Sequence, residues 1–405
     1  MIVLLQIFLK LFSLNEVLCT TFTRSLLNKI FFLLFLIFAF KGHTQKMRIG
    51  IFTECQLKKV KVAHSTAPYH IIADSTYIGL ANANDIVEVF LEGGKISILF
   101  RGNKLTKFKK ISFYTINKEE SIEFTGVVPS IKSRNYEGDF EFTLTNNAMR
   151  FVNIVELDTY LEGVVESESG TGQKLEYYKV QALISRTYAL KFRNKHIDDG
   201  YEICDRVHCQ AYLHKRLGST IIDSAVRQTA PKVLYDQNDE LAPCYFSANC
   251  GGQTCNPAHV WNETIDGLSS FKDTFCIYTK QATWKKSIPE AEWISFLVNN
   301  YNFPIDDSLS RQLLFHFVQT ERTAFYLHPG YGIPLRDIRE KFHLKSTFFN
   351  TRKEGAFIIV EGRGYGHGVG LCQEGAMKMA RNGYSYDQII RFYFPAVKIV
   401  DFTYK

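Results

Sequence analysis

Three glutamates within seven residues form the first group in this sequence whose type and spacing suit chemistry: Glu162, Glu166 and Glu168. The surrounding stretch is otherwise apolar and turn-like. An acid that cleaves a glycosidic bond must still be protonated near neutral pH, and an apolar setting raises the pKa of a carboxyl in that direction. Glu168, at the end of the stretch, is therefore a candidate general acid. Taken alone, however, such a triplet is more often a charged surface turn.

A second group lies near the C-terminus, where five glycines occupy alternate positions from Gly362 to Gly370. Because these glycines leave one edge of the loop without side chains, a bulky ligand can approach the backbone and meet Tyr365 and His367. A phosphate-binding glycine loop is a superficial match. It is disfavoured because the stretch has no Lys-Ser/Thr ending and no strand–helix–strand unit around it. A tight structural turn, the other alternative, leaves the histidine and the nearby Gln373 unexplained.

Two histidines and two cysteines lie within fourteen residues: His196, Cys204, His208 and Cys209. Two imidazoles and two thiolates can close a tetrahedral zinc site. Their spacing is not that of a zinc finger, and in an exported protein Cys204 and Cys209 could instead be oxidised, as the even number of cysteines after Cys19 also suggests. A catalytic metalloprotease zinc has no support, because no His-Glu-x-x-His segment is present. A structural metal and a disulfide-stapled loop both remain open.

The segments that would position these groups differ in their periodicity. From Arg48 to about Met149, short alternating apolar runs are separated by Gly, Asn and Asp clusters, which predicts β structure, with a hairpin at Gly93-Gly94. From Leu175 to Asn194 apolar residues recur at helical spacing, which predicts a helix whose buried stripe comprises Val180, Leu183, Ile184, Thr187 and Leu190. Lys179 and Arg186, seven residues apart, would project from one side of that helix.

The second half of the chain alternates between helical and β patterns. A β-rich stretch from Val233 to Ser247 is interrupted by Gly251-Gly252. Helical patterns follow at Pro289–Asn302, Leu335–Phe342 and Leu371–Asn382, the last of them closed by Gly383. Ser385 and Gln388 form a capping box that opens a short final helix. Helices and strands in this arrangement predict an α+β fold.

Composition and charge narrow the class of protein. The chain has 405 residues, enough for two compact units or one elaborated one, and its 46% hydrophobic and 22% charged residues are near the globular average. The net charge of +7 would suit an anionic partner such as nucleic acid, a membrane surface or a cell-wall polymer, but an ordinary solvated surface explains it equally well. No Lys/Arg run or zinc-finger spacing supports a nucleic-acid partner.

The N-terminal segment predicts export. An unbroken apolar run from Ile30 to Phe40 follows Arg24 and Lys29. The run is too short to span a bilayer comfortably, whereas a basic flank before a short apolar stretch is typical of a secretory signal. We therefore expect residues 1–46 to be a signal peptide or an N-terminal anchor that contacts the membrane, and the rest of the chain to lie in the periplasm or cell envelope.

In this order, the segments resemble the SpoIID/LytB family, which comprises stage II sporulation protein D and amidase-enhancer relatives. The resemblance runs from about Arg48 to the C-terminus and rests on these stretches: Val155 to Val165 with Glu168, Lys179 to Ala189, Gly362 to Ala376 and, more loosely, Tyr245 to Ser247 with Gly251-Gly252 and Trp261. The chain departs from the family pattern at Ser169, where methionine is usual, and at Cys372, where serine is usual.

The resemblance implies a lytic transglycosylase that acts on peptidoglycan glycan strands, preferably denuded ones, with Glu168 as its catalytic residue. It implies that the substrate groove is lined by Lys179, Arg186, Tyr245, Ser247, Tyr365, His367 and Gln373. Some members of the family bind zinc beside this groove through a Cys/His cluster. That favours Zn²⁺ over the disulfide at His196, Cys204, His208 and Cys209.

The resemblance also implies the domain organisation. Residues 47–150 would form a β-rich N-terminal part, and residues 151–405 a groove-forming α/β core with an inserted β-rich subdomain. The alternative function is that of a non-catalytic relative that binds glycan and stimulates a cell-wall amidase. An unrelated zinc-dependent hydrolase is disfavoured, because the metalloenzyme motifs are absent.

Overall fold

The computed structural model describes residues 45–403, except 118 and 146–147. The apolar run of the predicted export segment and Cys19 lie outside these residues. Within the described part of the chain, no helix combines the length and apolar character that crossing a membrane requires. The chain from Lys46 to Thr403 folds as one compact unit.

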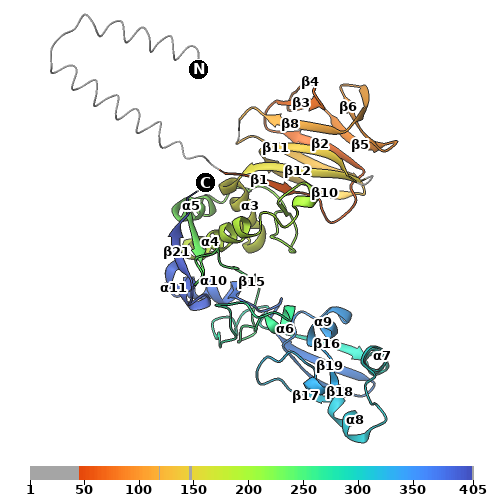
Figure 1. Cartoon of the computed structure of the whole chain (residues 1–405), viewed down its shortest axis with the longest axis vertical. Coiled ribbons are helices and arrows are strands. Elements are labelled where there is room, and N and C mark those ends of the chain that lie inside the picture. The colour runs from red at the N-terminus through yellow and green to blue at the C-terminus, as the bar shows by residue number, and fades with distance from the viewer. Residues whose placement is uncertain (1–44, 118, 146–147, 404–405) are drawn as a thin grey trace, which may run out of the picture. The chain divides into compact units, whose positions relative to one another are not determined.

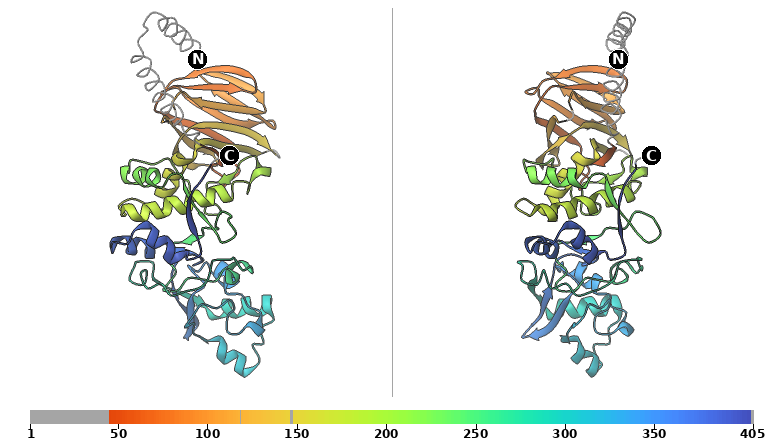
Figure 2. Two further views of the ribbon diagram at one scale, coloured as in Figure 1. Left: turned by 60° about the vertical axis from the view of Figure 1, so that its left-hand side comes forward. Right: turned by 90° about the vertical axis from the view of Figure 1, so that its left-hand side faces the viewer.

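Two β-sheets form the first part of this unit (Figures 1 and 2). One sheet has the strand order β13-β1-β12-β11-β8-β3-β4 and the other β10-β9-β2-β5-β6-β7. The strands are β1 (Lys46–Gly50), β2 (Lys59–Ser65), β3 (Tyr69–Ala73), β4 (Thr76–Ala81), β5 (Val87–Glu92), β6 (Lys95–Phe100), β7 (Asn103–Phe108), β8 (Lys110–Thr115), β9 (Ser121–Val128), β10 (Ile131–Glu137), β11 (Asp139–Thr145), β12 (Ala148–Glu156) and β13 (Ile203–Cys204).

Aromatic side chains join the two sheets into a sandwich. Phe124 on β9 lies 4.7 Å from Phe140 on β11 and 4.8 Å from Phe151 on β12, measured between ring centroids. All three rings are buried, as expected where alternate residues of facing sheets share one core. The predicted hairpin is confirmed, since β5 pairs with β6 and both Gly93 and Gly94 have positive φ. β12 continues to Glu156 and so passes the predicted domain boundary at residue 150.

Helix α4 (Leu175–Lys191) is the centre of the second part. It packs against α3 (Leu157–Ser169), α5 (Thr220–Thr229), α10 (Gln373–Arg381) and α11 (Tyr386–Tyr393). The predicted stripe is buried, but so is nearly every other side chain of the helix from Tyr177 onwards. Its polar residues Gln181, Ser185 and Thr187 are fully buried as well. Burial extends well beyond the predicted stripe, because helices cover α4 on several sides.

Short strands connect the C-terminal elements to this helical layer. β14 (Lys232–Tyr235) pairs with β21 (Lys398–Asp401), and β15 (Phe246–Ser247) pairs in parallel with β20 (Leu371–Cys372). The last helices are confirmed, with Gly383 at φ 90° after α10 and the capping box of Ser385 and Gln388 before α11. The first of them begins two residues later than predicted, because Leu371 and Cys372 belong to β20.

An inserted subdomain lies between β15 and β20 in the sequence. Its sheet has the order β16-β19-β18-β17, and its elements are β16 (Thr283–Pro289), α7 (Glu290–Tyr301), α8 (Ser308–Leu314), β17 (His316–Phe317), a 3₁₀ turn (Pro329–Tyr331), α9 (Leu335–Lys341), β18 (Phe349–Glu354) and β19 (Phe357–Arg363). Trp293, Tyr326 and Phe342 centre its own hydrophobic core. The helices predicted at Pro289–Asn302 and Leu335–Phe342 are confirmed, and so is the α+β fold class.

Candidate functional site

Glu168 lies in the last turn of α3, just before Gly170 ends the helix with φ 65°. Its Oε1 accepts a hydrogen bond of 2.7 Å from the backbone N–H of Ala211. No salt bridge to Glu168 is present among the described residues. Burial raises the pKa of this carboxyl, and the bond from Ala211 offsets only part of that effect. The negative end of the helix dipole also disfavours the ionised carboxylate. A carboxyl in this setting can hold its proton at a higher pH than an exposed glutamate.

The other two glutamates of the triplet have partners in the same region. Glu162 pairs with the guanidinium of Arg216 at 2.9 Å, and Glu166 accepts the backbone N–H of Leu217 at 2.6 Å. Glu166, like Glu168, accepts from one backbone N–H, and burial raises the pKa of Glu162 to about 7 despite Arg216. Glu162 and Glu166 lie within 4.0 Å of Arg216 and His214 respectively, whereas Glu168 has no such basic neighbour among the described residues.

These partners all come from one segment, 210–217, which lies against α3. The segment approaches closely because Gly163 has no side chain. A Cβ at Gly163 would lie 2.5 Å from the carbonyl oxygen of His214 and 2.6 Å from the ring of Tyr212. The glycine between Tyr160 and Glu168 therefore allows the Ala211 amide to reach the acid. We call α3 and the 210–217 segment the acid side of the site.

Gln373 connects the acid side to α10. Its Nε2 donates to the backbone oxygen of Glu168 at 3.4 Å and to Oε1 of Gln181 at 3.3 Å. The hydroxyl of Tyr177 also donates to Gln181, and it lies 3.0 Å from the hydroxyl of Ser169. Gln373 is itself buried, so its amide holds the end of α3 against α4 and α10. The structure thus brings this predicted ligand next to the candidate acid.

An aromatic row forms the second part of the site. Tyr245, Trp261 on α6 (Ala258–Trp261) and His367 follow one another, with ring centroids 4.6 and 5.4 Å apart. Ser247 accepts the backbone N–H of Gly368 at 3.2 Å, and Tyr365 leaves 47% of its surface exposed. We call residues 245–252, Trp261 and the glycine-rich loop 362–370 the loop side. Trp261 was not predicted as a site residue, although it was part of the looser family match.

His367 is held in its neutral form. Burial first, and then the positive charges of Arg339 and Arg322, lower its pKa to about 4. Its Nδ1 accepts the backbone N–H of Val369 at 3.0 Å, which leaves the proton of the neutral ring on Nε2. A hydrogen bond to the backbone of Phe246 acts the other way and raises the pKa, but less than burial lowers it. The ring has no free lone pair with which to accept a proton.

The contacts of Lys179 and Arg186 do not bring their charged groups to Glu168 or to the loop side. The ammonium of Lys179 pairs with Glu176 at 2.7 Å and lies over the ring of Tyr386 on α11. Arg186 has no exposed surface. Its guanidinium donates to the side chain of Asp158 and to backbone oxygens of Val226, Thr229 and Lys232, at 3.0–3.3 Å. These contacts tie α4 to α3, α5 and β14.

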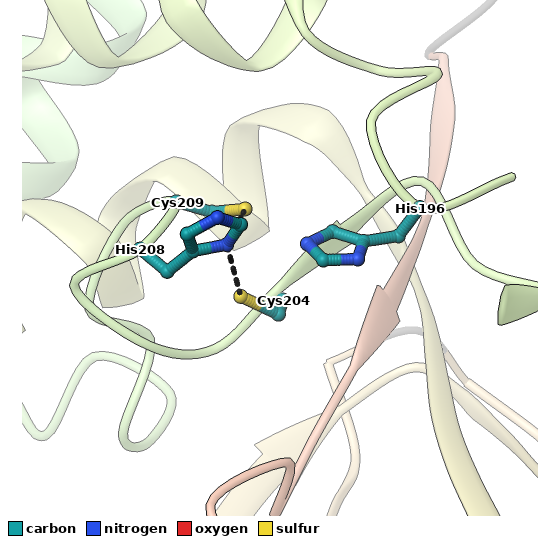
Figure 3. A group of neighbouring side chains, drawn as sticks. All are labelled: His196, Cys204, His208 and Cys209. Carbon is teal, nitrogen blue, oxygen red and sulfur yellow. Dashed lines mark hydrogen bonds between the residues drawn. The ribbon is translucent and has the colours of Figure 1, made fainter. Parts of the chain in front are cut away.

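The four side chains of the predicted metal cluster point toward one another (Figure 3). One ligand atom from each of His196, Cys204, His208 and Cys209 lies within 4.8 Å of all the others. The two sulfurs are 3.9 and 3.8 Å from Nδ1 of His208. Nε2 of His196 is buried and has no hydrogen-bond partner among the described residues, while its Nδ1 lies 3.0 Å from Asp199. Two sulfurs, two imidazoles and a carboxylate behind one imidazole fit a zinc ion.

The cysteines are free thiols in the structure. This holds for the eight that it describes, Cys204 and Cys209 included. The disulfides expected from their even number are therefore absent from the described part of the chain. The donor set of the cluster remains complete for a metal.

Comparisons with known proteins place these features in context. Residues 145–235 match the SpoIID family model, described as stage II sporulation protein. Stage II sporulation protein D of Bacillus subtilis is 29% identical over 267 residues, covering 62% of this chain and 76% of the relative. An uncharacterized protein of Brachyspira hyodysenteriae is 28% identical, with coverage of 66% and 73%. The amidase enhancer of Bacillus subtilis is 24% identical, with coverage of 85% and 56%. The family match contains Glu168 and the Cys/His cluster.

Proposed function

We propose that this chain belongs to the SpoIID/LytB family, which the family match and the relatives support, and that it is an exported peptidoglycan lytic transglycosylase. Its substrate would be the glycan strand, preferably without stem peptides. The observation that carries the proposal is the setting of Glu168. Its carboxyl lies at the end of α3, burial raises its pKa, and the backbone amide of Ala211 orients it.

One carboxyl suffices for this reaction because the nucleophile belongs to the substrate. Protonated Glu168 donates its proton to the oxygen that links N-acetylmuramic acid to N-acetylglucosamine, and the bond from C1 to that oxygen breaks. The carboxylate then takes the proton of the C6 hydroxyl of the same muramic residue as that oxygen bonds to C1. The products are a 1,6-anhydro end and a free N-acetylglucosamine end. No water is consumed, and Glu168 regains its proton.

The Ala211 amide would orient the carboxylate in both steps. A single N–H on Oε1 leaves the other oxygen free to exchange a proton with the substrate. The same amide stabilises the carboxylate formed after the first proton transfer. Glu168 can therefore act as acid and then as base without a second carboxylate.

The loop side would bind the sugar rings. The exposed ring of Tyr365 and the row of Tyr245, Trp261 and His367 offer apolar faces for sugars. The neutral ring of His367, held by backbone hydrogen bonds with Val369 and Phe246, would contribute to the row through its face. Gln373 would act by holding Glu168 in place. For Arg186 we propose a positioning role, because its donors are used inside the fold.

The Cys/His cluster would hold Zn²⁺ as a closed structural site, with His196, Cys204, His208 and Cys209 as ligands. When bound, the ion would supply a cross-link within the chain. Cys209 lies two residues before Ala211, so the cluster fixes the start of the segment that reaches Glu168. The bound metal would thus help to fix the position of Glu168 without taking part in the reaction.

Product analysis tests the proposal. The purified chain is incubated with glycan strands with and without stem peptides, and the products are identified by mass spectrometry. We expect 1,6-anhydro-N-acetylmuramic ends, formed faster from denuded strands. Reducing N-acetylmuramic ends would contradict the mechanism, since they require water as the nucleophile.

The alternative function has one observation in its favour. The relative that covers the largest share of this chain among those compared above is named amidase enhancer. On that alternative, the chain binds glycan, leaves it uncut, and raises the activity of a cell-wall amidase added to the same assay. Binding without cleavage, together with faster release of stem peptides by the amidase, would support it.

A further inference from the structure

A second cluster of metal-ligating side chains lies beneath the loop side. It consists of Cys250, Asp273, Cys276 and Cys372, each with no exposed surface. These residues come from three separate parts of the chain, after β15, before the inserted subdomain, and at the start of α10. One ligand atom from each lies within 4.8 Å of all the others. Three thiols and a carboxyl rarely gather in a protein core unless something binds them, because a buried polar group without a partner is costly.

The spacing of the donors suits a tetrahedral ion. The sulfur of Cys250 lies 3.3 Å from Oδ2 of Asp273 and 3.5 Å from the sulfur of Cys276. Zinc binds thiolate sulfur at about 2.3 Å and carboxylate oxygen at about 2.0 Å, so neighbouring ligands of a tetrahedral site are roughly 3.5–3.8 Å apart. These two distances are within a few tenths of an ångström of that geometry, and four donor atoms lie within 4.8 Å of one another.

Outer contacts orient these donors. The sulfur of Cys372 accepts backbone N–H groups from Cys250 at 3.2 Å and Gly375 at 3.4 Å. The hydroxyl of Tyr393 donates to Asp273 Oδ2 at 2.8 Å. A Cβ at Gly375 would lie 2.2 Å from that hydroxyl and 2.6 Å from the carboxylate, so the glycine keeps this contact open. Donors to thiolates and carboxylates are typical of the shell around a metal site, and they offset part of its negative charge.

A disulfide explains less of the cluster. A bond between Cys250 and Cys276 would use two sulfurs and leave the thiol of Cys372 and the carboxylate of Asp273 beside it. A buried carboxylate without a positive partner is costly, and no basic side chain forms a salt bridge with Asp273 among the described residues. A divalent cation accounts for all four donors at once. It also accounts for Cys372, which stands where the family usually has serine.

We infer that Cys250, Asp273, Cys276 and Cys372 bind a second zinc ion, in a closed structural site. All four positions would be filled by protein, so the site is separate from the proposed reaction and does not depend on it. It would join the segment after β15 to α10. Since Ser247 pairs with Cys372 between β15 and β20, the ion would hold the strands that carry the loop side.

Metal counting and ligand substitution test this inference. The full chain, purified without chelators, is analysed for zinc by elemental mass spectrometry, alone and as Cys209→Ser, Cys276→Ser and Cys244→Ser. We expect about two zinc ions per chain, one in each of the first two variants, and two in Cys244→Ser. Cys244 is the matched control because it is a buried free thiol outside both clusters.

A measurement on the unmodified protein covers the case in which Cys276→Ser does not fold. After replacement of zinc by cobalt, thiolate-to-metal absorption counts the sulfur ligands, and we expect five per chain, three of them from the second site. One zinc per chain in the unmodified protein with only two thiolate ligands would overturn the inference. A Cys250–Cys276 disulfide found by peptide mapping would overturn it as well.

Discussion

On the acid side, the functional carboxyl is held by a segment 43 residues later in the chain that contacts α3 along several residues. On the loop side, the functional rings are exposed or half-buried, and a glycine-rich loop carries two of them. The acid side holds a candidate acid whose Oε1 accepts one backbone N–H. The loop side is a surface of rings and neutral donors. On the proposed function, chemistry and glycan binding would be carried by separate parts of the chain, which substitutions can separate.

The largest expected effect comes from Glu168→Gln. Glutamine keeps the acceptor for the Ala211 amide but has no proton to donate. We expect cleavage to fall by about 10²–10⁴-fold while glycan binding, measured by co-sedimentation with strands, is retained. Glu166→Gln, the matched control, keeps its bond to Leu217 and most of the activity. Equal loss of cleavage in both variants would contradict the assignment of Glu168 as the acid, and loss of glycan binding in Glu168→Gln would contradict the division between the two sides.

Arg186→Ala should have the next largest effect, on stability. It leaves buried backbone oxygens of Val226, Thr229 and Lys232 without their donor, which should cost about 3 kcal/mol in the free energy of unfolding. Lys179→Ala removes a partly exposed ion pair and should cost about 1 kcal/mol or less. Urea unfolding followed by fluorescence measures both. Unchanged stability in Arg186→Ala, with weaker glycan binding, would restore the interpretation of Arg186 as a ligand.

Gly366→Ala should act on the loop side alone. Gly366 has φ 103°, and a Cβ there would lie 2.9 Å from the Cβ of Ser247, so the loop must shift. We expect KM for glycan to rise about fivefold with kcat nearly unchanged. Gly383→Ala is the control, because Gly383 has a similar φ of 90° but open space around it. A fall in kcat without a change in KM would show that the two sides are not separable.

The smallest effect concerns pH and His367. Its folded pKa, about 4, lies below the ordinary value of 6.5, so the unfolded chain binds the proton more readily. The stability that His367 contributes is present above pH 6.5 and is lost as the pH falls from there towards 4. We expect His367→Gln to flatten this part of the curve of thermal stability against pH. An unchanged curve would mean that the ring is not held neutral.

The sequence predicted features formed by residues that lie close together in the chain, and it did not predict features formed by distant residues. The Cys/His cluster lies within fourteen residues, and its four side chains do point together. The capping box and the hairpin glycines are local as well, and both were confirmed. The second cluster joins Cys250 to Cys372 across 122 residues, and no spacing rule relates positions that only the tertiary fold brings together. The Ala211 amide has no sequence signal at all, because every residue except proline has a backbone N–H.

Burial was the other feature that periodicity did not predict. Arg186 was expected to project beside the buried stripe and to line the substrate groove, yet it is fully buried in α4, as is Gln181. The pattern of a single helix does not indicate how many neighbours cover it. Charged and amide groups that hydrogen-bond inside a fold have the same sequence signature as groups that contact a ligand.

The pairing of β13 with β1 has a consequence for the order in which the chain folds. Ile203 and Cys204 add a parallel edge to β1, opposite Ile49 and Gly50. Synthesis must therefore continue more than 150 residues beyond β1 before that edge is covered, and contacts so distant in sequence form slowly. Until then the edge of β1 is open to pairing with other chains. Capture of a metal by Cys204 would lock β13 in place, so metal supply should set how long newly made chains remain prone to aggregation.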